Sequence, residues 1–214
     1  MSTDPILPTN LLQKLRKATF ALSLDISNDS QQKLIDYLAL LSRWNQAFNL
    51  TAIRDPEEML IKHIVDSLAV APYVKGARLI DVGSGAGLPG LVLALISPDQ
   101  QWTLLDSNGK KTRFLLQAKA VLGLQNVTVV HSRVEEFRPA HCFDGVIARA
   151  WASIHDMLAA TKHLYCEKAM LWAMKGVYPE EELSTIDHPY TVHRLVVPRL
   201  NEQRHLVCIL TART

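Results

Sequence analysis

Residues 78–96 constrain the fold of this chain more than any other segment. They consist of an apolar strand over 78–82, a turn with glycine at positions 83, 85 and 87, and an apolar helix from about residue 89 to 96. The three glycines lack a Cβ atom, so they can adopt positive φ and let a ligand approach the backbone closely. Pro89 has the fixed φ of a first helical turn. This strand, turn and helix predict a nucleotide-type cofactor site.

Two cofactor classes fit this turn. The run GAGLPG at 85–90 matches the dinucleotide fingerprint, and Asp106 follows at a suitable distance for a ribose. Asp81, however, stands two residues before the first glycine, where a carboxylate would repel a pyrophosphate and attract a cation. S-adenosylmethionine carries a sulfonium and an ammonium group and no phosphate, so Asp81 favours it. An NAD-linked oxidoreductase remains an alternative, whereas a P-loop is excluded because no Gly-Lys-Ser/Thr follows.

Strand and helix patterns alternate after residue 78, as in βαβ units that build a parallel sheet. A short helix near 179–186 and a closing hairpin should follow. We therefore predict an α/β fold with a mostly parallel, Rossmann-like sheet and a C-terminal antiparallel hairpin. The strands are expected near 78–82, 102–106, 126–130, 143–148, 169–174, 192–197 and 205–210, and the longer helices near 89–96, 109–122 and 153–162.

An N-terminal helical extension precedes this core. Apolar spacing predicts helices over 9–22 and 28–46, and the capping box at Asp55 starts a third helix that runs to about residue 68. We expect one domain over 1–214, with the extension at 1–76 and the cofactor-binding core at 77–214. The third helix carries His63, Asp66 and Ser67, which either make a structural polar contact or lie at the rim of the cofactor pocket.

Composition excludes several classes of protein. The three cysteines are scattered and none forms a C-x-x-C pair, so we expect neither a disulfide framework nor a metal site, and a reducing cytosol as the compartment. No apolar run approaches the ~20 residues that span a bilayer, and residues 1–5 lack the features of a signal peptide. The net charge of +2 is too small to argue for nucleic acid by itself. A nucleic-acid partner would need a local basic patch, for which the candidates are Arg54, Lys110, Arg113, Lys175 and Arg199.

Residues after the second, third and fourth strands indicate how the site could work. Asp106 could accept the hydroxyls of an adenosine ribose, Val134 could pack on the adenine ring, and Glu135 could meet its exocyclic amine. Arg149 would lie at the mouth of the site. The chain has no Asn/Asp-Pro-Pro-aromatic loop for amine methylation and no Pro-Cys nucleophile for carbon methylation. A ring nitrogen such as guanine N7 already offers a lone pair, so its methylation needs alignment and no deprotonation.

Six segments in order resemble the bacterial RsmG (GidB) family over about residues 30–212. They are WNQAFNLTAIRDP at 44–56, HIVDS at 63–67, IDVGSGAGLPG at 80–90, LDS at 105–107, SRVEE at 132–136 and IARA at 147–150. The resemblance implies a class I methyltransferase fold and methyl transfer from S-adenosylmethionine to N7 of one guanine in 16S ribosomal RNA of the small subunit. It also implies a cytoplasmic protein, which we expect to be a monomer.

The same resemblance assigns site residues by matching positions. Its implied cofactor contacts are Gly83, Leu88, Val134, Glu135 and Arg149, with no general base. Our own charge, glycine-turn and ribose considerations add Asp81, Gly85 and Asp106. A small-molecule methyltransferase and a noncatalytic RNA-binding module remain as alternatives.

Overall fold

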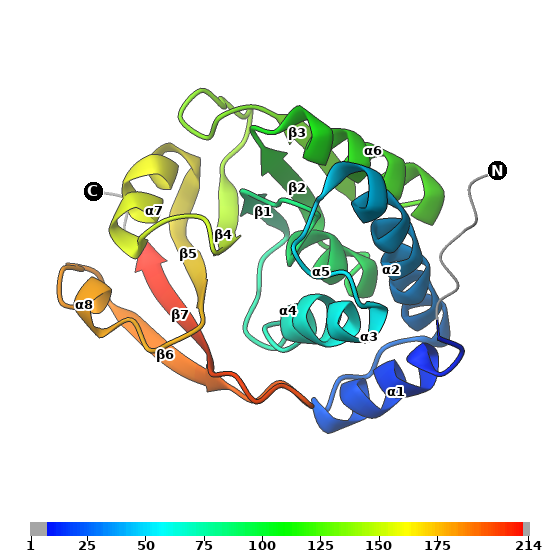
Figure 1. Ribbon diagram of the computed structural model, residues 1–214. Coiled ribbons are helices and arrows are strands. Elements are labelled where there is room, and N and C mark those ends of the chain that lie inside the picture. Colours follow the sequence, from blue (N-terminus) through cyan, green and yellow to red (C-terminus); the bar gives the residue numbers. More distant parts are fainter. Residues whose placement is uncertain (1–7, 212–214) are drawn as a thin grey trace.

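A seven-stranded sheet forms the centre of the protein (Figure 1). The computed structural model describes residues 8–211, so residues 1–5, where we expect no signal peptide, lie outside the described part. The strand order is β3-β2-β1-β4-β5-β7-β6, in which β1 to β5 pair in parallel and β7 lies antiparallel between β5 and β6. The predicted parallel sheet with a closing hairpin is thus confirmed. The strands are β1 (Arg78–Val82), β2 (Gln101–Asp106), β3 (Val127–His131), β4 (Phe143–Arg149), β5 (Tyr165–Lys175), β6 (Tyr190–Leu195) and β7 (Arg204–Thr211).

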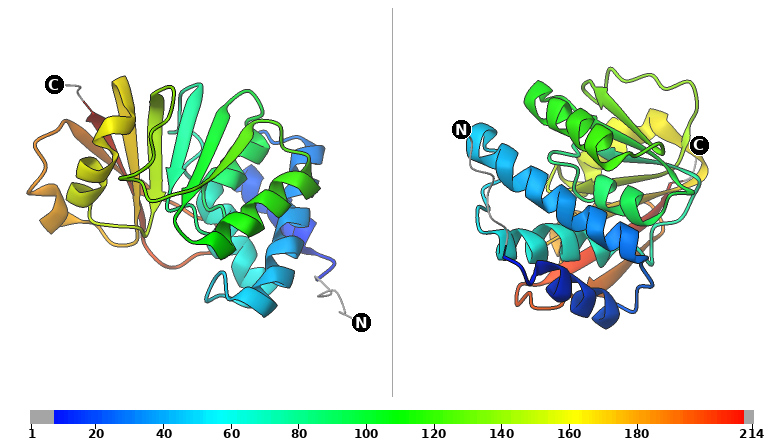
Figure 2. Two further views of the ribbon diagram at one scale, coloured as in Figure 1. Left: turned by 90° about the horizontal axis from the view of Figure 1, so that it is seen from above. Right: turned by 90° about the vertical axis from the view of Figure 1, so that its right-hand side faces the viewer.

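Helices cover the two faces of the sheet unequally (Figures 1 and 2). Side chains alternate along β1, so Leu79 packs into the larger core with the N-terminal helices, whereas Ile80 and Val82 pack into the smaller core with α7 and α8. The larger layer contains α1 (Leu11–Ala21), α2 (Asn28–Phe48), α3 (Pro56–Met59), a π-helical stretch (Leu60–Val65), α4 (Asp66–Leu68), α5 (Gly90–Ile96) and α6 (Gly109–Leu122). The smaller layer contains α7 (Ile154–Thr161), which continues into a 3₁₀ turn (Lys162–Leu164), and α8 (Glu180–Leu183).

The third predicted helix is present but is interrupted. Asp55 caps it as expected, with its Oδ1 accepting a hydrogen bond from the Glu58 N–H at 2.9 Å. The backbone then widens into the π-helical stretch Leu60–Val65 before α4 begins. The sequence pattern did not predict this wider turn, which lies where the helix faces the candidate site.

Helix α2 of the N-terminal extension makes a direct hydrogen bond to the glycine turn. The Tyr37 hydroxyl on α2 is fully buried and donates a hydrogen bond to the carbonyl oxygen of Ala86 at 2.5 Å. Burial also raises the pKa of Tyr37 far above its usual range, so the phenol remains a donor. The extension therefore supports the turn directly.

The expectation about the cysteines is wrong for two of them. A disulfide joins Cys142 to Cys166, whose Cα atoms are 5.0 Å apart. Phe143 and Tyr165 are partners in the parallel register of β4 and β5, which brings the two neighbouring cysteines together. Cys208 is free and buried on β7. Within residues 8–211, no helix is both long and apolar enough to cross a membrane.

Candidate active site

A cavity of about 390 Å³ opens at the carboxyl ends of β1, β2 and β3. The strand order reverses between β1 and β4, and ligands of open α/β sheets bind beside such a reversal. We call this the first cavity. It is lined by Val82, Gly83, Leu105, Asp106, Ser107, Asn108, Lys111, Ser132, Arg133, Val134, Glu135, Ala150 and Trp151.

Gly83 shows why the turn after β1 needs glycine. Its φ is +70°, and a Cβ atom built there would lie 2.9 Å from Cδ1 of Trp151. Its N–H donates to the carbonyl oxygen of Leu105 at 2.9 Å, which ties the turn to the end of β2. Both requirements keep the backbone of the turn against the first cavity.

Asp106 joins the end of β2 to the glycine turn. Its Oδ2 accepts from the Gly85 N–H and its Oδ1 from the Asn108 N–H, each at 2.8 Å. A carboxylate offers about four lone-pair positions, so two remain for hydroxyl donors in the cavity. Two further lining residues of this cavity are Val134, which is buried, and Glu135, which is exposed. The structure therefore brings Gly83, Asp106, Val134 and Glu135 together, as the sequence predicts.

Asp81 lies elsewhere than expected. Its side chain is fully buried beneath the glycine turn, where Oδ2 accepts from the Gly90 N–H at 2.8 Å and Oδ1 has no partner. A Cβ atom at Gly90 would lie 2.6 Å from Cβ of Asp81, so helix α5 packs directly on this carboxyl. Burial raises the pKa of Asp81 to about 7, with the Gly90 N–H opposing the rise. Leu88 is likewise buried, and neither residue lines the first cavity.

A second cavity of about 380 Å³ adjoins the first, and Ala150 lines both. Arg149 lines this second cavity and not the first. The second cavity is lined by Ile53, Lys62, His63, Asp66, Arg149, Ala150, Met174, Lys175, Gly176, Leu195, Arg204 and His205.

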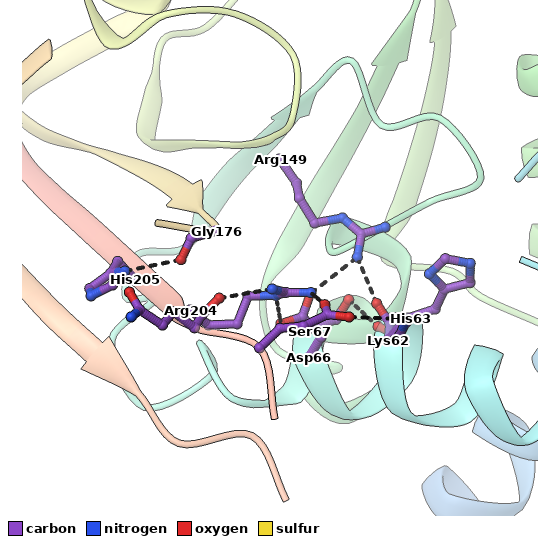
Figure 3. A network of polar contacts seen from close by, with 10 residues as sticks. Lys62, His63, Asp66, Ser67, Arg149, Gly176, Arg204 and His205 are labelled. Carbon is purple, nitrogen blue, oxygen red and sulfur yellow. Dashed lines mark hydrogen bonds and ion pairs between the residues drawn. The ribbon is translucent and has the colours of Figure 1, made fainter. Parts of the chain in front are cut away.

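Asp66 joins two arginines from distant strands at this second cavity (Figure 3). Its Oδ2 lies 3.4 Å from Nη1 of Arg149 at the end of β4, and its Oδ1 lies 3.1 Å from Nε of Arg204 at the start of β7. The carboxylate is almost fully buried. Burial raises the pKa of Asp66 even though both guanidinium groups act to lower it. Arg149 Nη1 also donates to the carbonyl oxygen of Lys62 at 3.1 Å, which fixes the arginine against the helix.

His63 lies at the second cavity, whereas Ser67 lies inside the protein. His63 lines the second cavity with only 6% of its surface exposed, and its Nε2 lies 2.9 Å from Thr51 Oγ1. Burial lowers the pKa of His63 to about 4, so the ring is neutral at neutral pH. Ser67 is fully buried and donates to the carbonyl oxygen of His63 at 2.6 Å, a contact within the helix. Asp66 and His63 thus belong to the cavity wall, whereas Ser67 is structural.

The basic candidates do not share one location. Lys175 lines the second cavity, although its Nζ is paired with Glu182 at 2.8 Å. Lys110 and Arg113 are exposed on α6, beside Lys111 of the first cavity. Arg54 is exposed and donates to Asn49, and Arg199 is exposed beside a small hollow lined by α1 residues.

Arg204, Lys62 and Lys111 line the two cavities and were not among our sequence predictions; Arg204 was the hardest to foresee. Arg204 stands 138 positions from its partner Asp66, so no local pattern connects the two residues. Its position immediately before the predicted strand 205–210 is the one signal that could have placed it at a strand end.

Comparisons with known proteins agree with this architecture. Residues 30–207 match the family described as rRNA small subunit methyltransferase G. The protein named "Ribosomal RNA small subunit methyltransferase G" of Psychromonas ingrahamii is 49% identical over 203 residues, covering 94% of this chain and 98% of that protein. The protein of the same name from Hydrogenovibrio crunogenus is 51% identical over 199 residues, covering 92% of each.

Solved structures show the fold. The O-methyltransferase TomG of Streptomyces achromogenes, in complex with SAM, superposes with a TM-score of 0.58 at 16% identity, covering 92% of this chain and 96% of that chain. The precorrin-6y C5,15-methyltransferase of Geobacter metallireducens gives 0.54 at 11% identity, covering 77% and 93%. The fold is therefore that of class I methyltransferases. Since the family match spans most of its length, the chain belongs to the rRNA small subunit methyltransferase G (GidB) family.

Proposed function

We propose that this protein transfers a methyl group from S-adenosylmethionine to N7 of one guanine in 16S ribosomal RNA of the small subunit. The observation that supports this most is the meeting of two cavities at Ala150, one suited to an adenosine cofactor and the other to a purine base. Membership of the family supports the choice of RNA as the methyl acceptor.

The residues of the first cavity fit S-adenosylmethionine. The free lone pairs of Asp106 suit the ribose hydroxyls, and Val134 and Glu135 suit the adenine. Lys111, which also lines this cavity and whose Nζ lies near Gly85 of the turn, offers a cation for the carboxylate of the methionine moiety. Bound there, the cofactor supplies an electrophilic methyl group on a sulfonium. Asp81 lies beneath the turn and does not line this cavity; with a pKa of about 7 it is ionised in part at neutral pH, and that ionised form favours a cationic ligand over a pyrophosphate.

The second cavity would hold the target base. Ile53, Met174 and Leu195 give it apolar surface, and Arg149 adds a planar cation that can stack on a purine. The N7 atom has its own lone pair, so the protein must align it and exclude water. The neutral ring of His63 and the paired carboxylate of Asp66 then serve to shape the wall, with no proton to remove.

No cysteine of this chain is positioned as a covalent nucleophile. Cys142 and Cys166 are joined at the amino ends of β4 and β5, opposite the cavities. Cys208 lies on β7, and burial raises the pKa of its thiol to about 11. We therefore propose direct transfer without a covalent enzyme intermediate.

The proposed substrate also indicates partners and location. A ribosomal RNA methyltransferase would work in the bacterial cytoplasm on the small ribosomal subunit, and we propose that it does so as a monomer without a metal ion. Lys175 at the second cavity, and Arg54, Lys110, Arg113 and Arg199 farther out, are the proposed RNA contacts.

Methyl transfer to ribosomal subunits tests this function. Small subunits from a bacterial strain that lacks its own methyltransferase of this family would be incubated with the protein and methyl-labelled S-adenosylmethionine. We expect one label per subunit, released by chemistry that cleaves RNA at N7-methylguanine. Label in any other RNA position, or only in small-molecule acceptors, would contradict the proposal and favour the small-molecule alternative.

A further inference from the structure

An acidic side chain from the β6–β7 loop forms ion pairs with two cationic side chains of the second cavity. The Glu202 carboxylate lies 3.1 Å from Nζ of Lys62 and 2.9 Å from Nη2 of Arg204. Lys62 and Arg204 both line the second cavity, whereas Glu202 does not. Its side chain is 52% exposed. The contact is therefore an ion pair at the mouth of the cavity, formed by a residue that can move away into solvent.

We propose that Lys62 and Arg204 form a subsite for an RNA phosphate next to the target guanosine, and that the Glu202 carboxylate fills it until RNA displaces it. This inference depends on the proposed function, because it takes RNA as the substrate. The ligand class is a phosphodiester group of single-stranded or looped RNA.

The arrangement of Arg204 supports an anion site. Its Nε is held by Asp66 inside the cavity and its Nη1 donates to the carbonyl oxygen of Gln203, so the guanidinium is fixed with Nη2 directed to Glu202. Carboxylate and phosphate oxygens make the same charge-assisted hydrogen bonds to arginine. A phosphate could therefore take the place of Glu202 without moving Arg204.

Lys62 supplies the second cation from the helix. Besides Glu202, its Nζ lies 3.7 Å from Oε1 of Glu58, a longer and exposed contact. Exposed ion pairs contribute little to stability, so the loss of Glu202 from this site should cost the fold little. A phosphodiester keeps its charge at all working pH values and brings the rest of the RNA surface with it.

This arrangement would weaken RNA binding in a selective way. RNA that offers only a phosphate would have to displace a carboxylate of similar chemistry, whereas RNA that also places a guanine in the second cavity would gain further contacts. Neutralising Glu202 should thus tighten RNA binding while leaving cofactor binding unchanged.

Four variants test the subsite. Glu202→Gln removes the competing charge. Glu167→Gln is the matched control, because it changes the net charge by the same amount as Glu202→Gln. Glu167 is exposed near the amino end of β5, at the opposite end of the strands from the cavities. Lys62→Gln removes one cation, and Lys62→Gln with Glu202→Gln completes a double-mutant cycle.

Affinity for the methyl-deficient small subunits would be measured by filter binding at about 0.1 M salt, together with kcat, KM and the Kd for S-adenosylmethionine. Compared with Glu167→Gln, we expect Glu202→Gln to lower Kd and KM for subunits by about threefold or more, the size given by one or two exposed ion pairs. The kcat and the cofactor Kd should stay within about twofold. In the Lys62→Gln background the gain from Glu202→Gln should shrink by at least half on a logarithmic scale.

Equal effects of Glu202→Gln and Glu167→Gln, or weaker RNA binding by Glu202→Gln, would overturn the subsite. If the parent protein methylates subunits in that case, the proposed function stands alone. Conversely, selective tightening by Glu202→Gln without any methylation by the parent would support the subsite and contradict the proposed methyl transfer.

Discussion

Replacing Asp81 by asparagine should change how stability depends on pH. The carboxyl is fully buried, and its burial raises its pKa from 3.8 to about 7. The folded protein then binds a proton that the unfolded chain releases above pH 3.8. The contribution of Asp81 to stability is therefore fully present below the unfolded pKa, is lost as pH rises to about 7, and stays lost above that value.

The magnitude follows from linkage. Each pH unit between the two pKa values changes the free energy of unfolding by about 1.4 kcal/mol. Between about pH 5.5 and about pH 8, the Asp81 carboxyl should cost the parent protein about 2 kcal/mol, all of it below about pH 7. In Asp81→Asn the side chain has no proton to lose, and its oxygen can still accept from the Gly90 N–H.

His63 must be separated from this effect because its sign is opposite. Burial lowers the pKa of His63 to about 4, so its contribution to stability increases as pH rises between about 4 and 6.5. The same histidine is present in the parent and in Asp81→Asn, so it cancels in their difference.

Urea unfolding of both proteins at about pH 5.5 and about pH 8 measures this difference. We expect the parent to lose about 2 kcal/mol relative to Asp81→Asn over that interval. Asp25→Asn, an exposed acid, is the control and should follow the parent. Parallel pH profiles for the parent and Asp81→Asn would refute the buried, proton-binding state of Asp81.

Three further substitutions test the support of the site. Tyr37→Phe leaves the buried carbonyl oxygen of Ala86 without a donor and should lower the free energy of unfolding by about 1–3 kcal/mol in a single urea transition. Tyr73→Phe is its control. Unfolding in two steps would contradict our proposal that the N-terminal extension and the core form one domain. Gly85→Asp places an acid at φ +59° beside the first cavity, so calorimetry should show at least tenfold weaker S-adenosylmethionine binding by a protein with unchanged circular dichroism; unchanged affinity would argue against the cavity. Asp66→Asn removes the charge that holds two partly buried arginines and should cost about 1–3 kcal/mol in thermal or urea unfolding, the range for hydrogen-bonding groups that lose their partner. A loss below about 0.5 kcal/mol would show that the pairs contribute little.

The sequence predicted the sheet and several lining residues of the first cavity because both depend on local patterns. Strand 78–82 was placed at its observed bounds, since an apolar run ends there in glycine. Gly83 follows β1 and Asp106 is the last residue of the neighbouring strand β2, and parallel strands bring their carboxyl ends together.

The prediction that Asp81 faces the ligand was wrong, although the alternation of side chains along a strand indicates the correct face. Ile80 and Val82 face α7, so Asp81 faces the opposite layer with Leu79, where α5 covers it.

Pairings that depend on tertiary register could not be predicted. Asp66 meets Arg204 only because β7 returns antiparallel beside β5, and Cys142 meets Cys166 only through the register of β4 and β5. Strand 165–175 also begins earlier than the predicted 169–174. In its first part Lys168 adopts a φ of +60° and the register with β4 shifts. None of these features has a signature within one element.

Calorimetric titration of the protein with S-adenosylmethionine and, separately, with NAD tests the central claim about the first cavity most directly. We predict one-to-one binding of S-adenosylmethionine and no heat with NAD. Binding of NAD without binding of S-adenosylmethionine would contradict the account.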